Sequence, residues 1–319
     1  MNLKKFVQKI TELRILVVGD VMIDEYFWGG MDRISPEAPV PIVTLHKKEQ
    51  RPGGAANVAL NLLSLGVTTD LASVIGKDLN GKLLKQLLSK HGISNTLFIE
   101  DGQRQTTCKT RVLARNQQVL RIDDEVTRAL TVSLQKQFIK KVCDYIDSHK
   151  PNAIIFEDYD KGLLNESIIT AIIDKAKSNN IITGVDPKKN NFMFYKKVTL
   201  FKPNARELNE ALHIQVKPEL SSLEDASLKL RQTIGCKNIL ITLSEHGMYY
   251  SGAQKGILHA HKRNIADVSG AGDTVICLAV LALALNYSIA DAAAIANLAG
   301  GLVCEHAGVV PVTPQMLLS

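Results

Sequence analysis

The chain has 319 residues, of which 45% are hydrophobic and 22% charged, and its formal net charge is +6. This length supports a sizeable buried core, and this composition is ordinary for a soluble enzyme. Acidic and basic residues are mixed along the chain and only 5% of residues are aromatic, which argues against nucleic-acid binding. A mildly positive protein suits small anionic substrates.

The cysteines and the apolar runs indicate the compartment. The five cysteines are odd in number and never form a Cys-x-x-Cys pair, so we expect reduced thiols and no zinc site. The longest apolar run, Val275–Leu285, is shorter than the roughly 20 residues that a membrane-spanning helix needs. Charged residues interrupt the apolar residues near the N-terminus, so no signal peptide is visible. The sequence therefore predicts a cytoplasmic protein with no membrane or nucleic-acid partner.

Short apolar runs alternate with amphipathic segments along the chain. Each run leads into polar or acidic residues, as Ile15–Val18 leads into Gly19-Asp20. Further strands are expected at residues 153–156, 181–185 and 239–243, and helices at 57–65, 81–91, 133–149, 167–179, 205–212 and 223–234. This alternation predicts an α/β fold whose mainly parallel sheet is covered on both faces and binds ligands at the carboxyl ends of its strands.

Two extended segments break this alternation. Residues 36–46 contain three prolines, and residues 106–123 contain several arginines. We expect both to form a small β lid over the site. Edge strands present unpaired backbone groups, so the lid also predicts a homodimer surface. No Ser/Gly/Pro-rich linker divides the chain, which indicates a single domain of residues 1–319 with this lid.

The turn Gly270-Ala-Gly272 leads directly into Asp273 and a long apolar stretch. Glycines leave backbone N–H groups uncovered, and the N-terminus of a helix carries partial positive charge, so this turn predicts a binding site for a transferring phosphoryl group. Asp273 at its mouth is a candidate general base toward an attacking hydroxyl. The alternative is an ordinary capped helix of the core.

A second glycine-rich turn, Arg51-Pro-Gly-Gly-Ala-Ala-Asn57, lies far upstream of the Gly-Ala-Gly-Asp turn. In this order the two turns resemble the two signatures of the ribokinase-like (PfkB) sugar kinases, and the resemblance covers nearly the whole chain. It implies a ribokinase-like three-layer α/β sandwich, ATP and Mg²⁺ as cofactors, and phosphoryl transfer to a sugar hydroxyl.

The resemblance also implies site residues. Asn204-Ala-Arg-Glu207 matches the Asn-x-x-Glu element of that family, which implies that Asn204 and Glu207 help to hold Mg²⁺ through water. The nucleotide-binding residues that it implies are Asn204, Glu207, Ser244, Gly247, Gly270, Gly272 and Asn297.

Further segments resemble a subgroup of that family, the D-glycero-β-D-manno-heptose-7-phosphate kinases. They are Gly19–Asp24, Arg33–Pro41, Arg51–Asn57, Lys109–Leu113 with Arg115–Gln118, Asp158–Gly162, Asp186–Lys188 and Gly270–Val275. The resemblance implies phosphorylation of the anomeric hydroxyl to the 1,7-bisphosphate, for the synthesis of ADP-heptose and the lipopolysaccharide core. The chain lacks the His-x-Gly-His motif of a fused nucleotidyltransferase, so it resembles the stand-alone kinase or a kinase half.

A sugar phosphate needs hydrogen-bond acceptors for its hydroxyls and cations for its phosphate. Candidate substrate-binding residues are Asp20, Asp24, Gly53, Gly54, Asn57, Lys109, Arg111, Arg115, Asp158, Lys161, Asp186 and Lys188. Asp158 and Asp186 could equally cap strand ends. Two alternatives stay open: another PfkB-type kinase acting on a free sugar or nucleoside, and a non-catalytic subunit that binds sugar phosphates.

Overall fold

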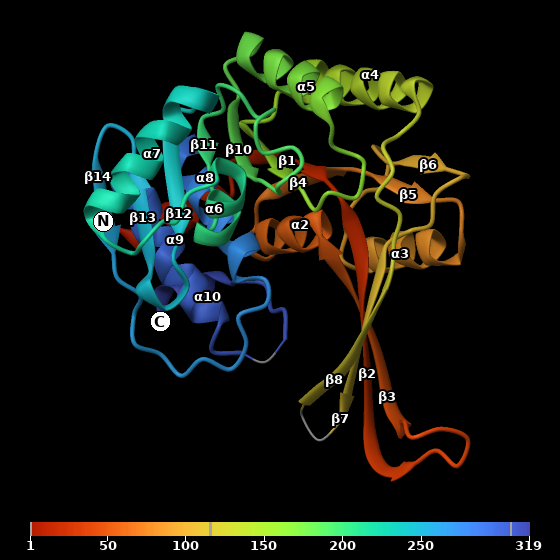
Figure 1. Cartoon of the computed structure of the whole chain (residues 1–319). Coiled ribbons are helices and arrows are strands. Elements are labelled where there is room, and N and C mark those ends of the chain that lie inside the picture. The colour runs from red at the N-terminus through yellow and green to blue at the C-terminus, as the bar shows by residue number, and fades with distance from the viewer. Residues whose placement is uncertain (1, 115–116, 307) are drawn as a thin grey trace.

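The computed structural model describes residues 2–114, 117–306 and 308–319 (Figure 1). Over this range the main sheet has eight strands in the order β14-β13-β12-β11-β10-β9-β1-β4. They are β1 (Arg14–Gly19), β4 (Thr68–Ala72), β9 (Ala153–Glu157), β10 (Ile182–Asp186), β11 (Leu200–Phe201), β12 (Asn238–Thr242), β13 (Met248–Ser251) and β14 (Lys255–Leu258). The pairs from β4 to β12 are parallel, and β13 and β14 continue the sheet antiparallel.

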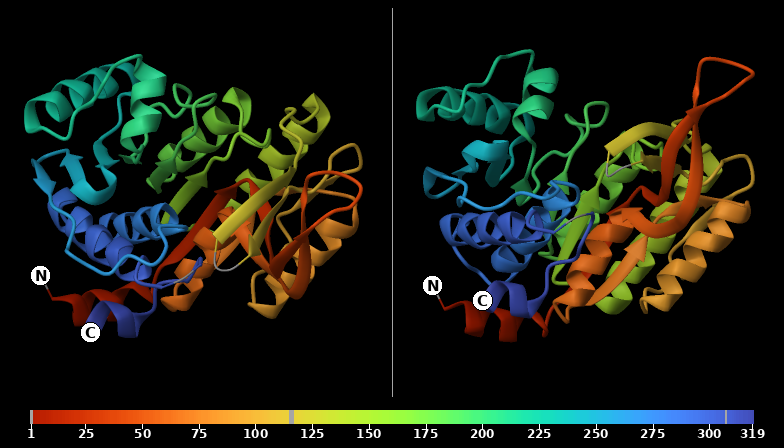
Figure 2. Two further views of the ribbon diagram at one scale, coloured as in Figure 1. Left: turned by 60° about the horizontal axis from the view of Figure 1, so that its bottom comes forward. Right: turned by 90° about the horizontal axis from the view of Figure 1, so that it is seen from below.

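Helices cover both faces of this sheet, which gives three layers (Figure 2). One face packs against α1 (Leu3–Ile10), α2 (Ala55–Ser64), α3 (Leu79–Lys90), α8 (Ala271–Ala284), α9 (Ile289–Val303) and α10 (Pro314–Leu318). The other packs against α4 (Val132–His149), α5 (Glu166–Ser178), α6 (Ala205–Leu212) and α7 (Leu220–Ile234). Within β1, Ile15 and Val17 join the first core while Leu16 and Val18 join the second, so both faces of the strand are apolar.

The strands and helices expected from the sequence are present, with ends that differ by a few residues. Four main-sheet strands were not expected, β13 and β14 together with β4 and β11, and the last two carried weak signals: β4 contains an aspartate and two threonines, and β11 has only two residues. Their strand conformation depends on parallel pairing with β1, and with β10 and β12, respectively. Among the described residues, no helix combines the length and apolar character needed to cross a membrane.

The lid is a separate four-stranded sheet in the order β3-β2-β7-β8 that projects from the main body (Figure 1). Its strands are β2 (Val21–Ile34), β3 (Pro41–Gly54), β7 (Cys108–Ala114) and β8 (Gln117–Asp124). It includes both segments that the sequence indicated, but residues 36–46 cover only the β2–β3 connection and the start of β3. The long strand β2 was not expected, because its acidic residues and its Gly29-Gly30 pair hide the alternating pattern. A small pair, β5 (Val74–Gly76) and β6 (Ile99–Asp101), lies beside the main sheet.

Helix α8 brings the Gly-Ala-Gly-Asp turn to the carboxyl edge of the main sheet. Its residues from Asp273 to Leu283 are all buried, as expected for a helix inside a core. It lies close to β10 at Gly184, where an added Cβ would be only 2.2 Å from the Val280 Cγ2 atom. The first turn of α8 lies beside the end of β10, because a Cβ added at Gly272 would be 3.6 Å from the Asp186 Oδ2 atom.

Candidate active site

Asp273 is buried in the first turn of α8, at the point where the sequence predicts a general base. The Nδ2 group of Asn57 donates a hydrogen bond to its Oδ2 atom (2.5 Å), and the Tyr159 hydroxyl donates to its Oδ1 atom (3.4 Å). Burial raises the pKa of Asp273 to about 6, although the Asn57 hydrogen bond and nearby lysines oppose this. The carboxylate is thus a stronger base than an ordinary aspartate and is still mostly ionised near neutral pH.

The turn before Asp273 has the geometry of an anion-binding helix start. Gly270 has a φ of +79°, a left-handed conformation that favours glycine. The N–H groups of the first helical turn have no carbonyl partner within the helix. Ala271 differs from its neighbours because its N–H donates to the Val268 carbonyl (3.3 Å), so it must give up that bond to contact a phosphoryl group. Gly272 faces Lys202, whose Nζ atom would be 3.7 Å from an added Cβ.

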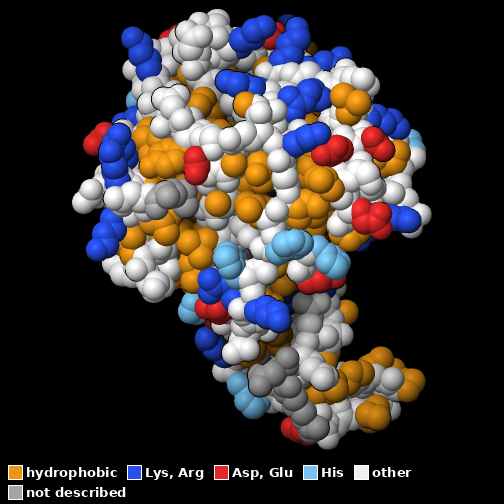
Figure 3. All heavy atoms as spheres, turned by 90° about the vertical axis from the view of Figure 1, so that its left-hand side faces the viewer, with side chains coloured by type: hydrophobic (Ala, Val, Ile, Leu, Met, Phe, Trp, Pro, Cys, Tyr) orange, Lys and Arg blue, Asp and Glu red, His pale blue; other side chains and the backbone are white. Residues whose placement is uncertain are grey.

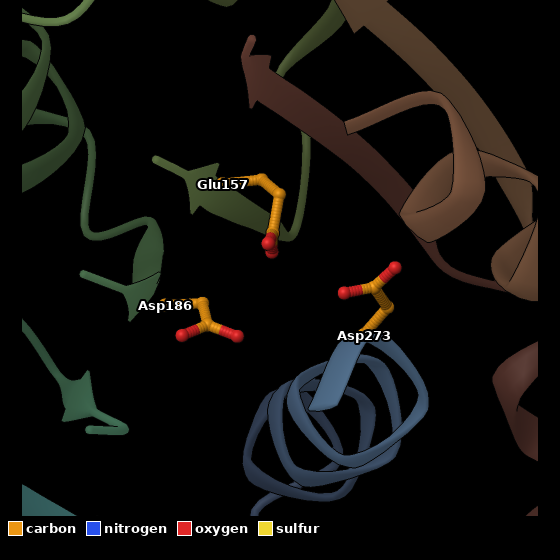
Figure 4. A group of neighbouring side chains, drawn as sticks. All are labelled: Glu157, Asp186 and Asp273. Atoms are coloured by element: carbon orange, nitrogen blue, oxygen red, sulfur yellow. The ribbon is translucent and has the colours of Figure 1, made fainter. Parts of the chain in front are cut away.

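Three acidic side chains meet at this edge of the sheet, and we call them the carboxylate cluster: Glu157, Asp186 and Asp273 (Figure 4). Glu157 and Asp186 are the last residues of β9 and β10 and are paired in register. One oxygen from each of the three side chains lies within 4.8 Å of those of the other two. Burial and the two neighbouring carboxylates raise the pKa of Glu157 well above its usual range.

Two lysines border the carboxylate cluster. Lys202 is almost fully buried and forms an ion pair with Asp186 (2.8 Å). Burial opposes charge on Lys202, yet Asp186 and Glu207 raise its pKa above the ordinary value. Lys188 pairs with Glu207 and also lies over the Tyr159 ring, with its Nζ atom 5.4 Å from the ring centre. Both ammonium groups therefore stay charged beside the first turn of α8, where they can attract a phosphate.

Asn204 and Glu207 form a capping box at the start of α6. The Asn204 side chain accepts from the Glu207 N–H (2.8 Å), and the Glu207 Oε2 atom accepts from the Asn204 N–H (2.9 Å). The other carboxylate oxygen of Glu207 accepts from Lys188. Both Glu207 oxygens are thus already hydrogen-bonded, which favours contact with a metal through water over direct coordination. This role of Asn204 and Glu207 stays a prediction.

On the other side of Asp273, a cavity of about 560 Å³ lies between the lid and the main body. Asp24 and Arg51 of the lid and Asn57 of α2 line it, so Asn57 contacts both the cavity and Asp273. The Asp24 carboxylate accepts a hydrogen bond from Arg111 on the neighbouring strand β7. A small polar molecule in this cavity would find both acceptors and donors beside a buried base.

The sequence of this chain matches that of known enzymes along almost its whole length. The profile of the pfkB family carbohydrate kinases matches residues 12–316. The chain belongs to the pfkB family of carbohydrate kinases. It is therefore a phosphotransferase with an alcohol group as acceptor, and the predicted family is confirmed.

Two relatives of this kinase are longer proteins. The bifunctional protein HldE of Trichlorobacter lovleyi is 38% identical over 314 residues, which cover 98% of this chain and 63% of that protein. HldE of Desulfatibacillum aliphaticivorans is 39% identical over 316 residues, which cover 98% of this chain and 64% of that protein. The chain thus spans less than two-thirds of the length of these relatives.

Solved structures share the fold of this kinase. Phosphofructokinase-2 from Escherichia coli in complex with potassium superposes with a TM-score of 0.78 at 17% identity, covering 96% of this chain and 97% of that one. Arabidopsis thaliana ribokinase complexed with ribose and ATP superposes with a TM-score of 0.72 at 15% identity, with the same coverage. At such identities the likeness concerns the fold alone, and it confirms the predicted ribokinase-like architecture.

Gly53 and Gly54 form the turn that joins the lid to α2 of the kinase. A Cβ added at Gly53 would lie 2.0 Å from the Asp24 Oδ2 atom. Gly54 has a φ of +61° and would bring a Cβ to 2.4 Å from the Asp20 carbonyl oxygen. Both glycines therefore let the backbone approach Asp24 and Asp20 closely, and they add no side chain there.

Gly53→Ala should displace the Asp24 carboxylate and raise the KM for the acceptor about 10- to 100-fold, because an error of about 1 Å in positioning is costly. The KM for ATP should stay unchanged. Steady-state kinetics with each substrate varied in turn would measure both effects. Gly102→Ala is a matched control, because an added Cβ there meets no atom within 4 Å. An unchanged acceptor KM in Gly53→Ala would remove Asp24 from the binding site.

The side chains of Asp20 and Asp158 are occupied by protein groups. The Asp20 carboxylate accepts from the backbone N–H groups of Tyr159 (3.0 Å) and Lys161 (3.1 Å). Asp158 is fully buried and accepts from the Tyr195 hydroxyl (2.6 Å) and from Asn191 (3.0 Å). Both aspartates thus hold the loop after β9 in place. Their direct contact with substrate, like that of Asp186, stays a prediction.

The lysines predicted to bind phosphate converge on one carboxylate. Lys109 and Lys161 both pair with Glu125, at 3.1 Å and 2.8 Å. Lys109 also pairs with Asp123 (3.1 Å) and is paired in register with Asp24 in the lid sheet. The residues that line the cavity include Asp24 but neither lysine, so Lys109 neighbours the cavity only through its register partner Asp24, and Arg111 through its hydrogen bond to Asp24. Arg115 lies outside the described residues.

The nucleotide-binding residues that the family resemblance implied lie at the same edge of the sheet. Ser244 and Gly247 belong to the turn after β12, a short 3-10 helix, η1 (Ser244–His246), and the residue that follows it. Gly247 has a φ of +90°, which only glycine adopts without strain. The Asn297 side chain of α9 donates to the His259 carbonyl (2.9 Å) and so fixes the loop before the Gly-Ala-Gly turn. Contact of these residues with a nucleotide stays a prediction.

Three residues of the site, Glu157, Tyr159 and Lys202, were not predicted from the sequence. Glu157 ends β9 and Lys202 follows β11, so both occupy the strand ends at which parallel sheets bind ligands. Their position after a strand was therefore a usable signal. Tyr159 had no such signal, because its approach to Asp273 depends on the hydrogen bonds between its loop and Asp20.

Proposed function

We propose that this kinase transfers the γ-phosphoryl group of ATP to the anomeric hydroxyl of D-glycero-β-D-manno-heptose 7-phosphate. The product would be the 1,7-bisphosphate, for ADP-heptose and lipopolysaccharide core synthesis. The observation that carries this choice of acceptor is the pair of lysines, Lys109 and Lys161, which share Glu125, with Lys109 in register with Asp24 of the cavity wall. The resemblance to heptose-7-phosphate kinases and the HldE relatives support it.

In the proposed reaction Asp273 accepts the proton of the anomeric hydroxyl while that oxygen attacks the γ-phosphorus, the bond to the β,γ-bridging oxygen breaks, and ADP leaves. Asn57 and Tyr159 hold the carboxylate through hydrogen bonds at its two oxygens. The amides at the start of α8 and the Lys202 ammonium stabilise the negative charge on the transferring group. The burial of Asp273 excludes water, which would otherwise compete for the phosphoryl group.

We propose ATP and Mg²⁺ as cofactors. The chemistry of this edge of the sheet suits a divalent cation, because it offers buried carboxylates, one of which has an oxygen with no hydrogen-bond partner in the part of the chain that the structure describes. Asn204 and Glu207 would hold the nucleotide's metal through water, and Ser244, Gly247 and Asn297 would border the nucleotide. When bound, Mg²⁺ neutralises charge on the β- and γ-phosphate oxygens.

A coupled assay of ADP release over a panel of sugars and sugar phosphates tests this function. Heptose 7-phosphate is expected to be the best acceptor, and ³¹P NMR of its product should show a second phosphate at the anomeric position. Better use of fructose 6-phosphate, ribose or adenosine would favour another kinase activity within the family. Absence of ADP release with every acceptor would favour a non-catalytic binding subunit.

We also propose that this single-domain cytoplasmic kinase forms a homodimer through its lids. Every residue of the edge strand β8 is exposed, including Leu120 and Ile122, which are 54% and 51% exposed. Ile34 and Leu45 on the first two lid strands are also exposed. Figure 3 shows hydrophobic side chains gathered on the projecting lid. Pairing of two lids would cover these side chains and the unpaired edge of β8.

Light scattering at working concentration should therefore give the mass of a dimer. Ile122→Glu should convert it to a monomer, because a charge would be buried without a partner in the interface. Leu228→Glu is the matched control, since Leu228 is 56% exposed on α7, far from the lid in the sequence and the fold. A monomeric wild-type protein, or a dimer that survives Ile122→Glu, would contradict the lid interface.

A further inference from the structure

Arg51, near the end of β3, connects the lid to the main body. Its guanidinium pairs with Glu49 of the same strand (2.5 Å) and lies over the ring of Tyr26 on β2, with its Cζ atom 5.3 Å from the ring centre. From this position in the lid, its Nη1 group donates a hydrogen bond to the Val309 carbonyl of the main body (3.2 Å). Arg51 and Val309 both line the cavity between the lid and the body, so this bond forms part of the cavity wall.

The segment that contains Val309 supports the anion-binding turn at Gly270. A Cβ added at Gly270 would lie 3.0 Å from the Val309 Cγ1 atom. The neighbouring Gly308 donates its N–H to one carboxylate oxygen of Asp267 (3.1 Å), and the other oxygen accepts from the Ser269 N–H (2.9 Å). The segment that Arg51 contacts is therefore fixed to the residues just before the turn.

On the lid side, Arg51 is connected to a group that we expect to bind the acceptor. Arg111 lies over the same Tyr26 ring, with its Cζ atom 5.4 Å from the ring centre, and donates to the Asp24 carboxylate. Tyr26 is only 8% exposed, so both guanidinium groups contact a ring that is held by packing. Direct contacts thus connect Asp24 to Arg51 and, through it, to the anion-binding turn.

We propose that Arg51 is a positioning residue, which holds the anion-binding turn in place when a sugar acceptor fixes the lid. The lid is a separate sheet that projects from the main body, so its position depends on contacts such as this bond (Figure 1). An acceptor that contacts both Asp24 and Asn57 favours the lid position in which Arg51 reaches Val309. The acceptor then favours binding of the γ-phosphate at the turn, and by reciprocity the nucleotide favours the acceptor. This inference rests on the proposed function, because it needs a sugar beneath the lid and a phosphoryl group at the turn.

Calorimetric titration with the ATP analogue AMP-PNP and Mg²⁺ tests this coupling. The Kd of AMP-PNP for the wild type should be about 5- to 150-fold lower with saturating heptose 7-phosphate than without it. Arg51→Met should bring this ratio close to one. Arg51→Lys should do so as well, because a single ammonium group lacks the fixed fork that joins Glu49 to the Val309 carbonyl. The acceptor is saturating, so a direct contact between Arg51 and the sugar does not alter the ratio.

Lys48→Met is the matched control. Lys48 lies on the same strand, pairs with Glu25 (2.8 Å) and lies over the ring of Phe27 (4.9 Å), so it makes the same kinds of lid contact as Arg51. This variant should keep the wild-type ratio. A loss of coupling in Lys48→Met as well would indicate a general disturbance of the lid and would overturn the role of Arg51.

Hydrogen exchange provides a second readout, which needs no nucleotide. Saturating heptose 7-phosphate should slow exchange of the Gly308 and Ser269 amides in the wild type and in Lys48→Met, but not in Arg51→Met. A wild-type Kd ratio close to one, or a wild-type ratio in Arg51→Met or Arg51→Lys, would overturn the proposal. If the ADP-release panel identifies another acceptor, the same measurements are made with that sugar, so a wrong acceptor and an absent coupling are distinguishable.

Discussion

Asp273→Asn should lower kcat by about 10²–10⁴-fold, because the amide cannot accept the proton of the attacking hydroxyl. Asparagine has nearly the shape of aspartate, so the first turn of α8 and its contact with Asn57 should persist. The affinity for ATP should therefore stay close to that of the wild type. Single-turnover kinetics and calorimetric titration with ATP would separate the two effects.

Asp291→Asn is the matched control for this variant. Asp291 occupies the first turn of α9, as Asp273 does in α8, but it is bonded to Ser288 at the protein surface. Its replacement should leave turnover unchanged. Near-wild-type turnover of Asp273→Asn would remove this carboxylate from the chemistry, and loss of ATP affinity in parallel with turnover would indicate a structural role instead.

Removal of the phosphate from the acceptor should lower kcat/KM by roughly 10²–10⁴-fold, because a charged hydrogen bond contributes about 1.5–3 kcal/mol and two lysines are available. Heptose 7-phosphate should thus be used far better than unphosphorylated heptose. The coupled ADP-release assay measures the ratio directly. Equal efficiency with both acceptors would contradict the assignment of Lys109 and Lys161 to the phosphate.

A lysine variant identifies the source of this preference. Lys161→Met should reduce the ratio of kcat/KM for heptose 7-phosphate to kcat/KM for unphosphorylated heptose. It weakens binding of the phosphorylated sugar and leaves the free sugar unaffected. Lys255→Met is the matched control, since Lys255 pairs with Glu224 (2.9 Å) outside the site. If Lys161→Met leaves this kcat/KM ratio unchanged, the phosphate of the acceptor does not bind at Lys161.

The sequence was sufficient where local chemistry decides the structure. Continuous apolar runs such as Ala153–Phe156 have to be buried on both faces, and this alone predicts a parallel sheet between two helical layers. The turn at Gly270 is also a local matter, because glycine permits the positive φ that starts α8. Asp273 lies three residues after Gly270, so its place in the first turn of α8 is predicted by the same local signal.

Tertiary structure decided the contacts between distant segments. Glu157, Asp186 and Asp273 are far apart in the chain, and only the register of β9 with β10 and the close approach of α8 bring them together. Tertiary structure also determines that Asp20 holds the loop after β9, because the N–H groups that donate to Asp20 lie far away in the sequence.

In the lid, too, the sequence predicts one part of the structure and tertiary contacts decide the other. Strand β2 has no clear alternating pattern, so the sequence does not predict its length. Pairing with β3 and β7 satisfies its backbone hydrogen-bonding groups and makes it a long strand. That pairing also sets Asp24 beside Lys109, and thereby the proposed hydroxyl acceptor beside a proposed phosphate-binding cation. Residue types along the chain thus determined which chemistry is available to this kinase. Long-range strand pairing and helix packing decided which groups meet, because such contacts depend on backbone geometry that no local pattern encodes.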